Sequence, residues 1–136
     1  MALLAAQSAS AQSQSPAQPL RITVPTVIVT AQKEPADGQT LPVSVTAISK
    51  DAMADAGVSG LSDTAIYAPN TYFSEFSARK LSFPHFRGIS SGPGNPAITT
   101  YVDGVPQLHT NTSSLELLDV DQIELVRGGQ SALFGR

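Results

Sequence analysis

A serine in a glycine-flanked motif is the first candidate for chemistry in this sequence. Residues 88–92 read Gly-Ile-Ser-Ser-Gly, so Ser90 takes the nucleophile position of the G-x-S-x-G motif of α/β-hydrolases. Asp103 and His109 follow in the chain order of such a triad. The motif requires a sharp strand-to-helix turn, where the start of the helix helps to form the oxyanion hole. Residues 93–96, Pro-Gly-Asn-Pro, cannot begin a regular helix, which argues against a serine hydrolase.

Histidines and acidic residues are the other candidates for a reactive or metal-binding site. His85 and His109 stand in separate loop-like regions, without a second ligand at zinc-site spacing. Asp119, Asp121 and Glu124 lack the D-x-D-x-D-G run of a calcium loop. The chain has no cysteine, which excludes thiolate ligands and thiol nucleophiles. We therefore predict a non-enzymatic protein with no cofactor and no metal.

Binding of a small molecule is the chemistry that residues 72–80 suit best. They read Tyr-Phe-Ser-Glu-Phe-Ser-Ala-Arg-Lys and combine aromatic, polar and basic side chains. Such residues on a loop are typical of ligand contact. The alternative is that Phe73 and Phe76 belong to the hydrophobic core. The sequence leaves both interpretations open.

Size and charge limit the functions that the chain can have. Its 136 residues suffice for one small domain, and 41% of them are hydrophobic. The net charge of −3 argues against nucleic acid as the main partner, because phosphate binding needs a basic surface. The densest basic cluster comprises only Arg79, Lys80 and Arg87. No apolar run approaches the roughly 20 residues of a membrane-spanning helix.

The first 41 residues differ in composition from the rest. Residues 1–11 end in Ala-Ser-Ala, a small-x-small pattern, and we expect a signal-peptide remnant there. Residues 12–41 are expected to be a linker rich in polar residues and proline. Within it, residues 26–31 read Thr-Val-Ile-Val-Thr-Ala and favour an extended strand that pairs with the edge of another sheet. An ordinary first strand of the domain is the alternative.

From residue 42 onward the pattern predicts one α+β domain with a small mixed β-sheet, short helices and long loops. Alternating residues predict strands near 43–48, 98–102 and 122–126. Ser49 and Ser59 can each cap a short helix, which Gly57 and Pro69 would end. Asp103-Gly104 is a strong hairpin-turn signal, and residues 130–134 favour a last short helix. These elements would hold the candidate residues on loops at the ends of short strands.

The order of these segments resembles the plug domain of TonB-dependent outer-membrane receptors. The resemblance rests on five successive segments: PVSVTAISKDAMADAG, GLSDTAIYAPNTYF, FRGISS, TTYVDGVP and DVDQIELVRGGQSALFGR. It covers residues 42–136, and TVIVTAQK at 26–33 resembles the upstream TonB box. The chain would then be an N-terminal part of a receptor: a C-terminally incomplete plug without the barrel.

The resemblance implies a fold, a function and a location. The plug would lie inside the receptor's own β-barrel in the cell outer membrane, with its N-terminus in the periplasm. TonB would bind by strand addition, and the receptor would take up a scarce small-molecule ligand such as an iron-siderophore. The alternative is a free-standing periplasmic domain that binds TonB or a ligand.

The resemblance also implies roles for individual residues. Arg87 and Arg127 would anchor the plug to glutamates of the barrel. The apical loops would contact ligand through Phe76, Arg79, Gln107 and His109. TonB contact would fall on Thr26, Val27, Ile28, Val29, Thr30 and Ala31.

Two positions depart from the family pattern. Pro25 stands where the TonB box usually has an acidic residue, and Gly129 replaces the proline of the RGPQS motif. Glycine at 129 should loosen that turn, because it has more conformational freedom than proline.

Overall fold

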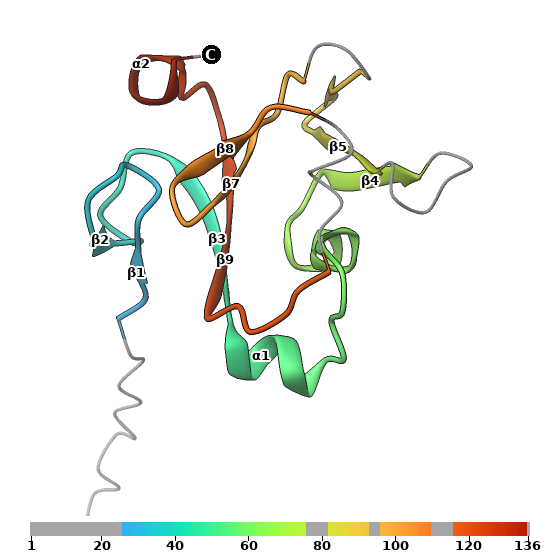
Figure 1. Ribbon diagram of the computed structural model, residues 1–136. Helices are drawn as coiled ribbons and strands as arrows, with labels where there is room; N and C mark the ends of the chain where they lie inside the picture. The colour runs from blue at the N-terminus through green and yellow to red at the C-terminus, as the bar shows by residue number, and fades with distance from the viewer. Residues whose placement is uncertain (1–25, 76–81, 93–95, 110–115, 136) are drawn as a thin grey trace, which may run out of the picture.

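The computed structural model describes residues 26–75, 82–92, 96–109 and 116–135 (Figure 1). It confirms the predicted α+β class, with small antiparallel sheets and few short helices. The expected signal-peptide remnant, the linker up to residue 25, Phe76 and Arg79 lie outside the described residues. Within them, no helix combines the length and apolar character needed to cross a membrane. The strands are β1 Ile28–Val29, β2 Ala36–Asp37, β3 Ser44–Ser49, β4 Thr71–Glu75, β5 Ser82–Phe86, β6 Ile89–Ser90, β7 Thr100–Val102, β8 Val105–Gln107 and β9 Gln122–Arg127; the helices are α1 Lys50–Asp55, the 3₁₀ helix η1 Leu61–Tyr67 and α2 Ser131–Phe134.

Strands β3 and β9 form the centre of the molecule. They pair antiparallel from Ser44 with Arg127 to Ser49 with Gln122, and so join the two ends of the domain sequence (Figure 1). Every second residue of β9 is buried, as the pattern of a strand with one core-facing side requires. The buried core beneath this pair comprises Ile48, Met53, Ala68, Ile123 and Leu125.

Two short helices follow β3. The Ser49 hydroxyl caps α1 by accepting a hydrogen bond from the Ala52 amide, and Gly57 follows its end with a left-handed φ of 65°. The second helix differs from the prediction, because η1 is a 3₁₀ helix whose N-cap is Gly60 and not Ser59. The Asp63 carboxylate, in the first turn, caps the start of this helix by accepting hydrogen bonds from the amides of Ser59 and Gly60.

Two further antiparallel sheets follow along the chain. Strands β4, β5 and β6 form an antiparallel sheet, and Pro84 lies inside β5 opposite Phe73. Strands β7 and β8 form the hairpin that Asp103-Gly104 predicts. Asp103 and Gly104 have φ of 48° and 79°, as a two-residue turn with two left-handed positions requires.

Residues 26–41, which belong to the expected linker, contain a short hairpin that lies on the domain. Strand β1 pairs antiparallel with β2, with Ile28 opposite Asp37 and Val29 opposite Ala36. Val29 and Ala31 are buried at 1% and 4% exposure. Figure 1 shows this hairpin beside the central β3–β9 pair.

Candidate functional site

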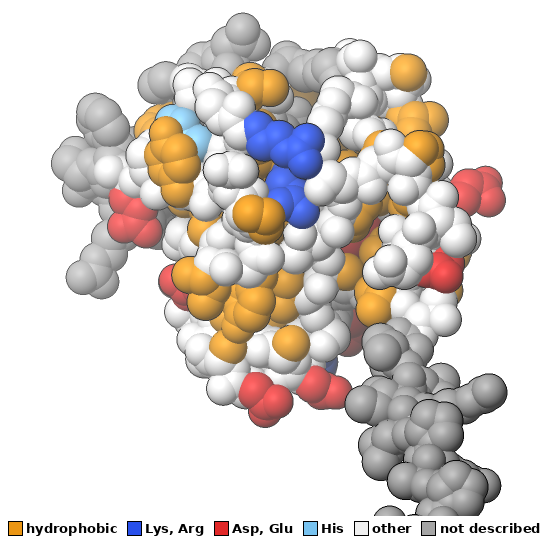
Figure 2. Space-filling view, turned by 180° about the vertical axis from the view of Figure 1, so that it is seen from behind, with side chains coloured by type: hydrophobic (Ala, Val, Ile, Leu, Met, Phe, Trp, Pro, Cys, Tyr) orange, Lys and Arg blue, Asp and Glu red, His pale blue; other side chains and the backbone are white. Residues whose placement is uncertain are grey.

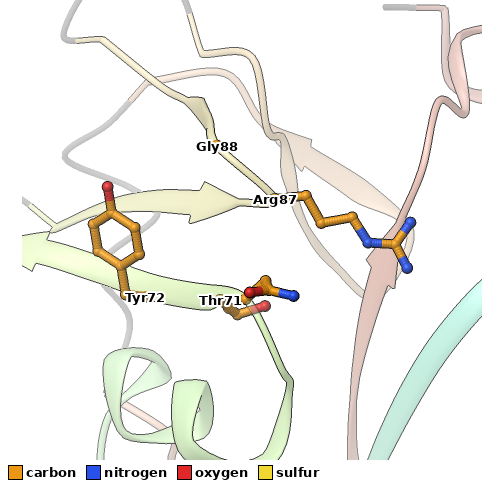
Figure 3. Close-up of a pocket in the computed structure, with 5 residues that line it drawn as sticks. Thr71, Tyr72, Arg87 and Gly88 are labelled. Carbon is orange, nitrogen blue, oxygen red and sulfur yellow. The ribbon is translucent and has the colours of Figure 1, made fainter.

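Arg87 lies at an open hollow at the end of the β4–β5 sheet (Figure 3). The hollow has a volume of about 410 Å³, and its walls are Asn70, Thr71, Tyr72, Arg87 and Gly88. The backbone of Arg87 is left-handed, with a φ of 50°, and its amide donates to the Asn70 carbonyl at 2.9 Å. Arg87 directly follows β5, and in Figure 3 its side chain extends away from Tyr72. A non-glycine residue rarely adopts this conformation, and Arg87 is exposed.

Arg127 lies in the same region but is buried, at 7% exposure. Its guanidinium donates through Nη1 to the Pro69 carbonyl at 3.1 Å and through Nη2 to the Thr46 hydroxyl at 2.9 Å. Its Nε atom is buried and has no hydrogen-bond partner among the described residues. Both acceptors are neutral, so within the described part of the chain no carboxylate balances this buried charge.

The two arginines are brought together by one short segment. Arg127 binds the carbonyl of Pro69, and the Arg87 backbone binds the carbonyl of the next residue, Asn70. The neighbouring Thr71 hydroxyl is buried and also lacks a partner among the described residues. On the face shown in Figure 2 the positive side chains form one central cluster, while the acidic side chains lie toward the edges. This arrangement suits a carboxylate brought by another part of a larger assembly.

The segment of residues 26–31 is held by both of its backbone edges. On one edge the Val27 carbonyl accepts a hydrogen bond from the Gly38 amide at 3.0 Å. On the other edge the Ile28 carbonyl accepts from Gln122 Nε2 at 3.1 Å, and the Thr30 amide donates to Glu124 Oε1 at 2.7 Å. Within the segment Ile28–Val29 are extended as β1 and residue 31 begins a turn, and the segment is docked on the outer face of β9.

The predicted ligand-contacting residues are only partly within the described chain. Gln107 ends β8 and His109 follows it, and His109 is exposed. Gln107 Nε2 donates to the Val105 carbonyl at 3.3 Å. Phe76 and Arg79 belong to residues 76–81, which the structure does not describe.

Sequence reasoning missed a polar and aromatic cluster on the exposed face of β4 and β5. The rings of Tyr72 and His85 stack with their centroids 4.3 Å apart, and the Ser74 hydroxyl lies 2.7 Å from His85 Nε2. Tyr72 and Ser74 are two apart on one strand, which puts them on one face. Their contact with His85 depends on the β4–β5 register, for which the sequence carries no signal.

The structure does not give Ser90 the setting of a hydrolase nucleophile. Ser90 lies in β6 and is exposed, and residues 91–92 after it are not helical. The neighbouring Ser91 is buried, and its hydroxyl accepts a hydrogen bond from the Ile98 amide at 3.0 Å. Asp103 belongs to the β7–β8 turn. The motif therefore lacks the strand-to-helix turn that its chemistry requires.

The acidic candidates for a cation site have other partners. Asp119 accepts a hydrogen bond from Lys50 Nζ at 2.7 Å, and this contact lowers the pKa of Asp119 and raises that of Lys50. Glu124 accepts from Thr30. Across the described ranges, no three histidine or acidic side chains converge as metal ligands would.

Comparison with known proteins found a matching family and several related receptors. The family model described as "TonB-dependent Receptor Plug Domain" matches residues 37–136. The pesticin receptor of Yersinia pestis is 39% identical over 114 residues, which are 82% of this chain and 17% of that receptor. The pesticin receptor of Yersinia enterocolitica is 41% identical over 96 residues, which are 69% of this chain and 14% of that receptor.

A solved structure agrees with these relatives. The ferric yersiniabactin uptake receptor FyuA from Yersinia pestis superimposes with a TM-score of 0.63 at 36% identity. The match covers 69% of this chain and 15% of FyuA. The chain thus spans well under a fifth of the length of each of these proteins.

Proposed function

Because the chain belongs to the TonB-dependent receptor plug family, we propose that it serves in the uptake of an iron-siderophore across the outer membrane. The observation that carries this proposal is the likeness to FyuA, a ferric yersiniabactin uptake receptor, in both fold and sequence. These relatives are receptors, and the role that we infer is a non-enzymatic one.

The buried Arg127 supports a position inside a barrel. Its guanidinium has a buried Nε without a partner, and its two hydrogen bonds go to neutral oxygens. Burying an arginine without a counter-charge is costly, and a glutamate on a surrounding wall would offset that cost. Arg87, which is exposed beside it, offers a second anchor. We propose that both arginines hold the plug to acidic residues of the barrel.

The docked segment supports TonB as the partner on the periplasmic side. Strand β1 of this segment is extended, and the backbone edge that faces away from β2 is the one that a strand of another protein would pair with. Because the upper loops would face the ligand, we propose that Phe76, Arg79, Gln107 and His109 contact the siderophore. This proposal places the N-terminus in the periplasm and the plug within the outer membrane.

A chimeric receptor tests the proposed function. Residues 37–136 would replace the matching segment of FyuA, and uptake of ferric yersiniabactin would be measured in iron-starved cells with and without TonB. We expect TonB-dependent uptake, reduced at least tenfold by Arg127→Ala. A chimera that inserts in the outer membrane at normal levels but takes up no ferric yersiniabactin would contradict the proposal. TonB binding by the isolated chain, combined with that failure, would favour a free-standing periplasmic domain.

A further inference from the structure

The backbone geometry of β1 shows which of its edges is open to a partner. In an antiparallel pair, alternate residues point their N–H and C=O groups to opposite edges. The Gly38 amide donates a hydrogen bond to the Val27 carbonyl, so the backbone N–H and C=O groups of residues 27 and 29 point toward β2. The Ile28 carbonyl and the Thr30 amide therefore face the other edge. A strand-adding partner needs that second edge, because β2 occupies the first.

Two side chains of β9 occupy this second edge. Gln122 Nε2 donates to the Ile28 carbonyl at 3.1 Å, and Glu124 Oε1 accepts from the Thr30 amide at 2.7 Å and from its hydroxyl at 3.0 Å. An amide donor and a carboxylate acceptor thus make the contacts that a neighbouring strand would make. These contacts come from the side chains of β9 and not from its backbone, which pairs along one edge with β3.

The spacing of the two side chains fits this role. Gln122 and Glu124 are two residues apart, so they stand on the same face of β9, opposite the core-facing Ile123 and Leu125. The Ile28 carbonyl and the Thr30 amide are likewise two residues apart. Gln122 Nε2 also donates to Glu124 Oε1 at 3.0 Å, which holds the pair in one geometry. We call Gln122 and Glu124 the edge clamp.

We propose that the edge clamp competes with strand addition, so that a partner must displace Gln122 and Glu124 before it can pair with residues 28–30. This inference rests on the proposed function, in which that partner is TonB. The clamp lowers the affinity of the resting plug for TonB without altering the residues that TonB would contact. It also explains why an extended segment with an unpaired edge stays on its own domain.

Binding of purified periplasmic TonB to the full chain tests the clamp. Glu124→Ala removes the acceptor of two bonds from Thr30, and we expect TonB to bind about tenfold more tightly, as measured by calorimetry. Gln122→Ala removes one bond, and a gain of about threefold is expected. Glu124→Gln keeps an acceptor oxygen and should stay within about twofold of the parent chain. Glu75→Ala, which removes an exposed charge on β4, is the matched control and should change nothing.

Hydrogen exchange at the Thr30 amide tests the clamp independently of TonB. We expect this amide to exchange at least tenfold faster in Glu124→Ala than in the parent chain or in Glu75→Ala. Unchanged exchange at Thr30, or unchanged TonB affinity in both clamp variants with native circular dichroism, would overturn the clamp. If Glu124→Ala does not fold, Gln122→Ala decides by the same two measurements, with Glu124→Gln as the control that should resemble the parent chain. Faster Thr30 exchange without TonB binding by any variant would instead refute TonB as partner and leave the clamp standing.

Discussion

At the scale of single residues, Asp63 shows how one carboxylate fixes a helix start. Hydrogen bonds from the backbone amides of Gly60 and Ser59 lower its pKa below the ordinary value of 3.8. Its stabilising effect is therefore present above pH 3.8 and is lost as the pH falls through the lower, folded-state pKa. Asp63→Asn should cost about 1 kcal/mol of unfolding free energy at pH 7 and much less at pH 2. Urea titrations at the two pH values measure this difference, and an equal loss at both would exclude the carboxylate's charge as the cause.

A substitution at Arg127 tests whether this residue mainly stabilises the fold or mainly anchors the plug to a partner. Its two hydrogen bonds go to neutral acceptors, the Thr46 hydroxyl and the Pro69 carbonyl. Arg127→Met should therefore leave the unfolding free energy of the chain within about 1 kcal/mol of the parent, because a buried charge is removed and its volume is kept. The same change should abolish uptake by the FyuA chimera. A loss of several kcal/mol in the isolated chain would show that the arginine mainly supports the fold. The sequence singled out Arg127, but its contacts with β3 and with the end of η1 required the folded chain.

At the scale of elements, the β7–β8 hairpin shows what local sequence can predict. Asp103-Gly104 between alternating residues specifies a tight turn, and both residues are left-handed in the structure. Gly104→Ala should cost about 1 kcal/mol in unfolding free energy, because a Cβ is disfavoured at φ 79°. Gly129→Ala is the control, since Gly129 does not have a left-handed φ and has open space around its Cβ position. It should raise the unfolding free energy by about 0.4–1 kcal/mol, and thermal melting compares the two variants. Equal effects would contradict the turn argument.

Other elements depend on contacts that no local pattern contains. The 3₁₀ form of η1 follows from the way Asp63 bonds back to Ser59 and Gly60, whereas the serine at 59 suggested an ordinary cap. Pro84 fits within β5 although proline usually ends such a strand. The hairpin of β1 and β2 stays on the domain through Gln122 and Glu124, which lie 94 residues from their partners. The local pattern thus predicted strands β3, β7 and β9 and the Asp103-Gly104 turn. The position of the N-terminal segment depends on hydrogen bonds between residues far apart in the sequence.

Across the whole molecule, several large apolar side chains of the described residues lie on the surface. Ile66 and Leu118 are each 80% exposed, and Leu108 and Val105 are exposed at 60% and 59%. Apolar side chains in such numbers are typical of a surface that another part of a protein covers. Figure 2 shows hydrophobic side chains spread around the positive cluster on that face. A plug enclosed by a barrel would account for both observations, since the wall would cover the apolar residues and neutralise the arginines.

The small core makes the chain sensitive to single truncations within it. Ile123, at 8% exposure, lies in β9 opposite Ile48 of β3, and this pair joins the two ends of the domain. Ile123→Ala should cost about 2–4 kcal/mol of unfolding free energy, because it removes buried methyl groups and leaves a cavity. Ile66→Ala is the matched control and should cost less than about 0.5 kcal/mol, because Ile66 is 80% exposed. Urea denaturation measures both. Similar losses in the two variants would mean that the β3–β9 pair does not hold the domain together, and the barrel wall would then have to supply the stability that its core lacks.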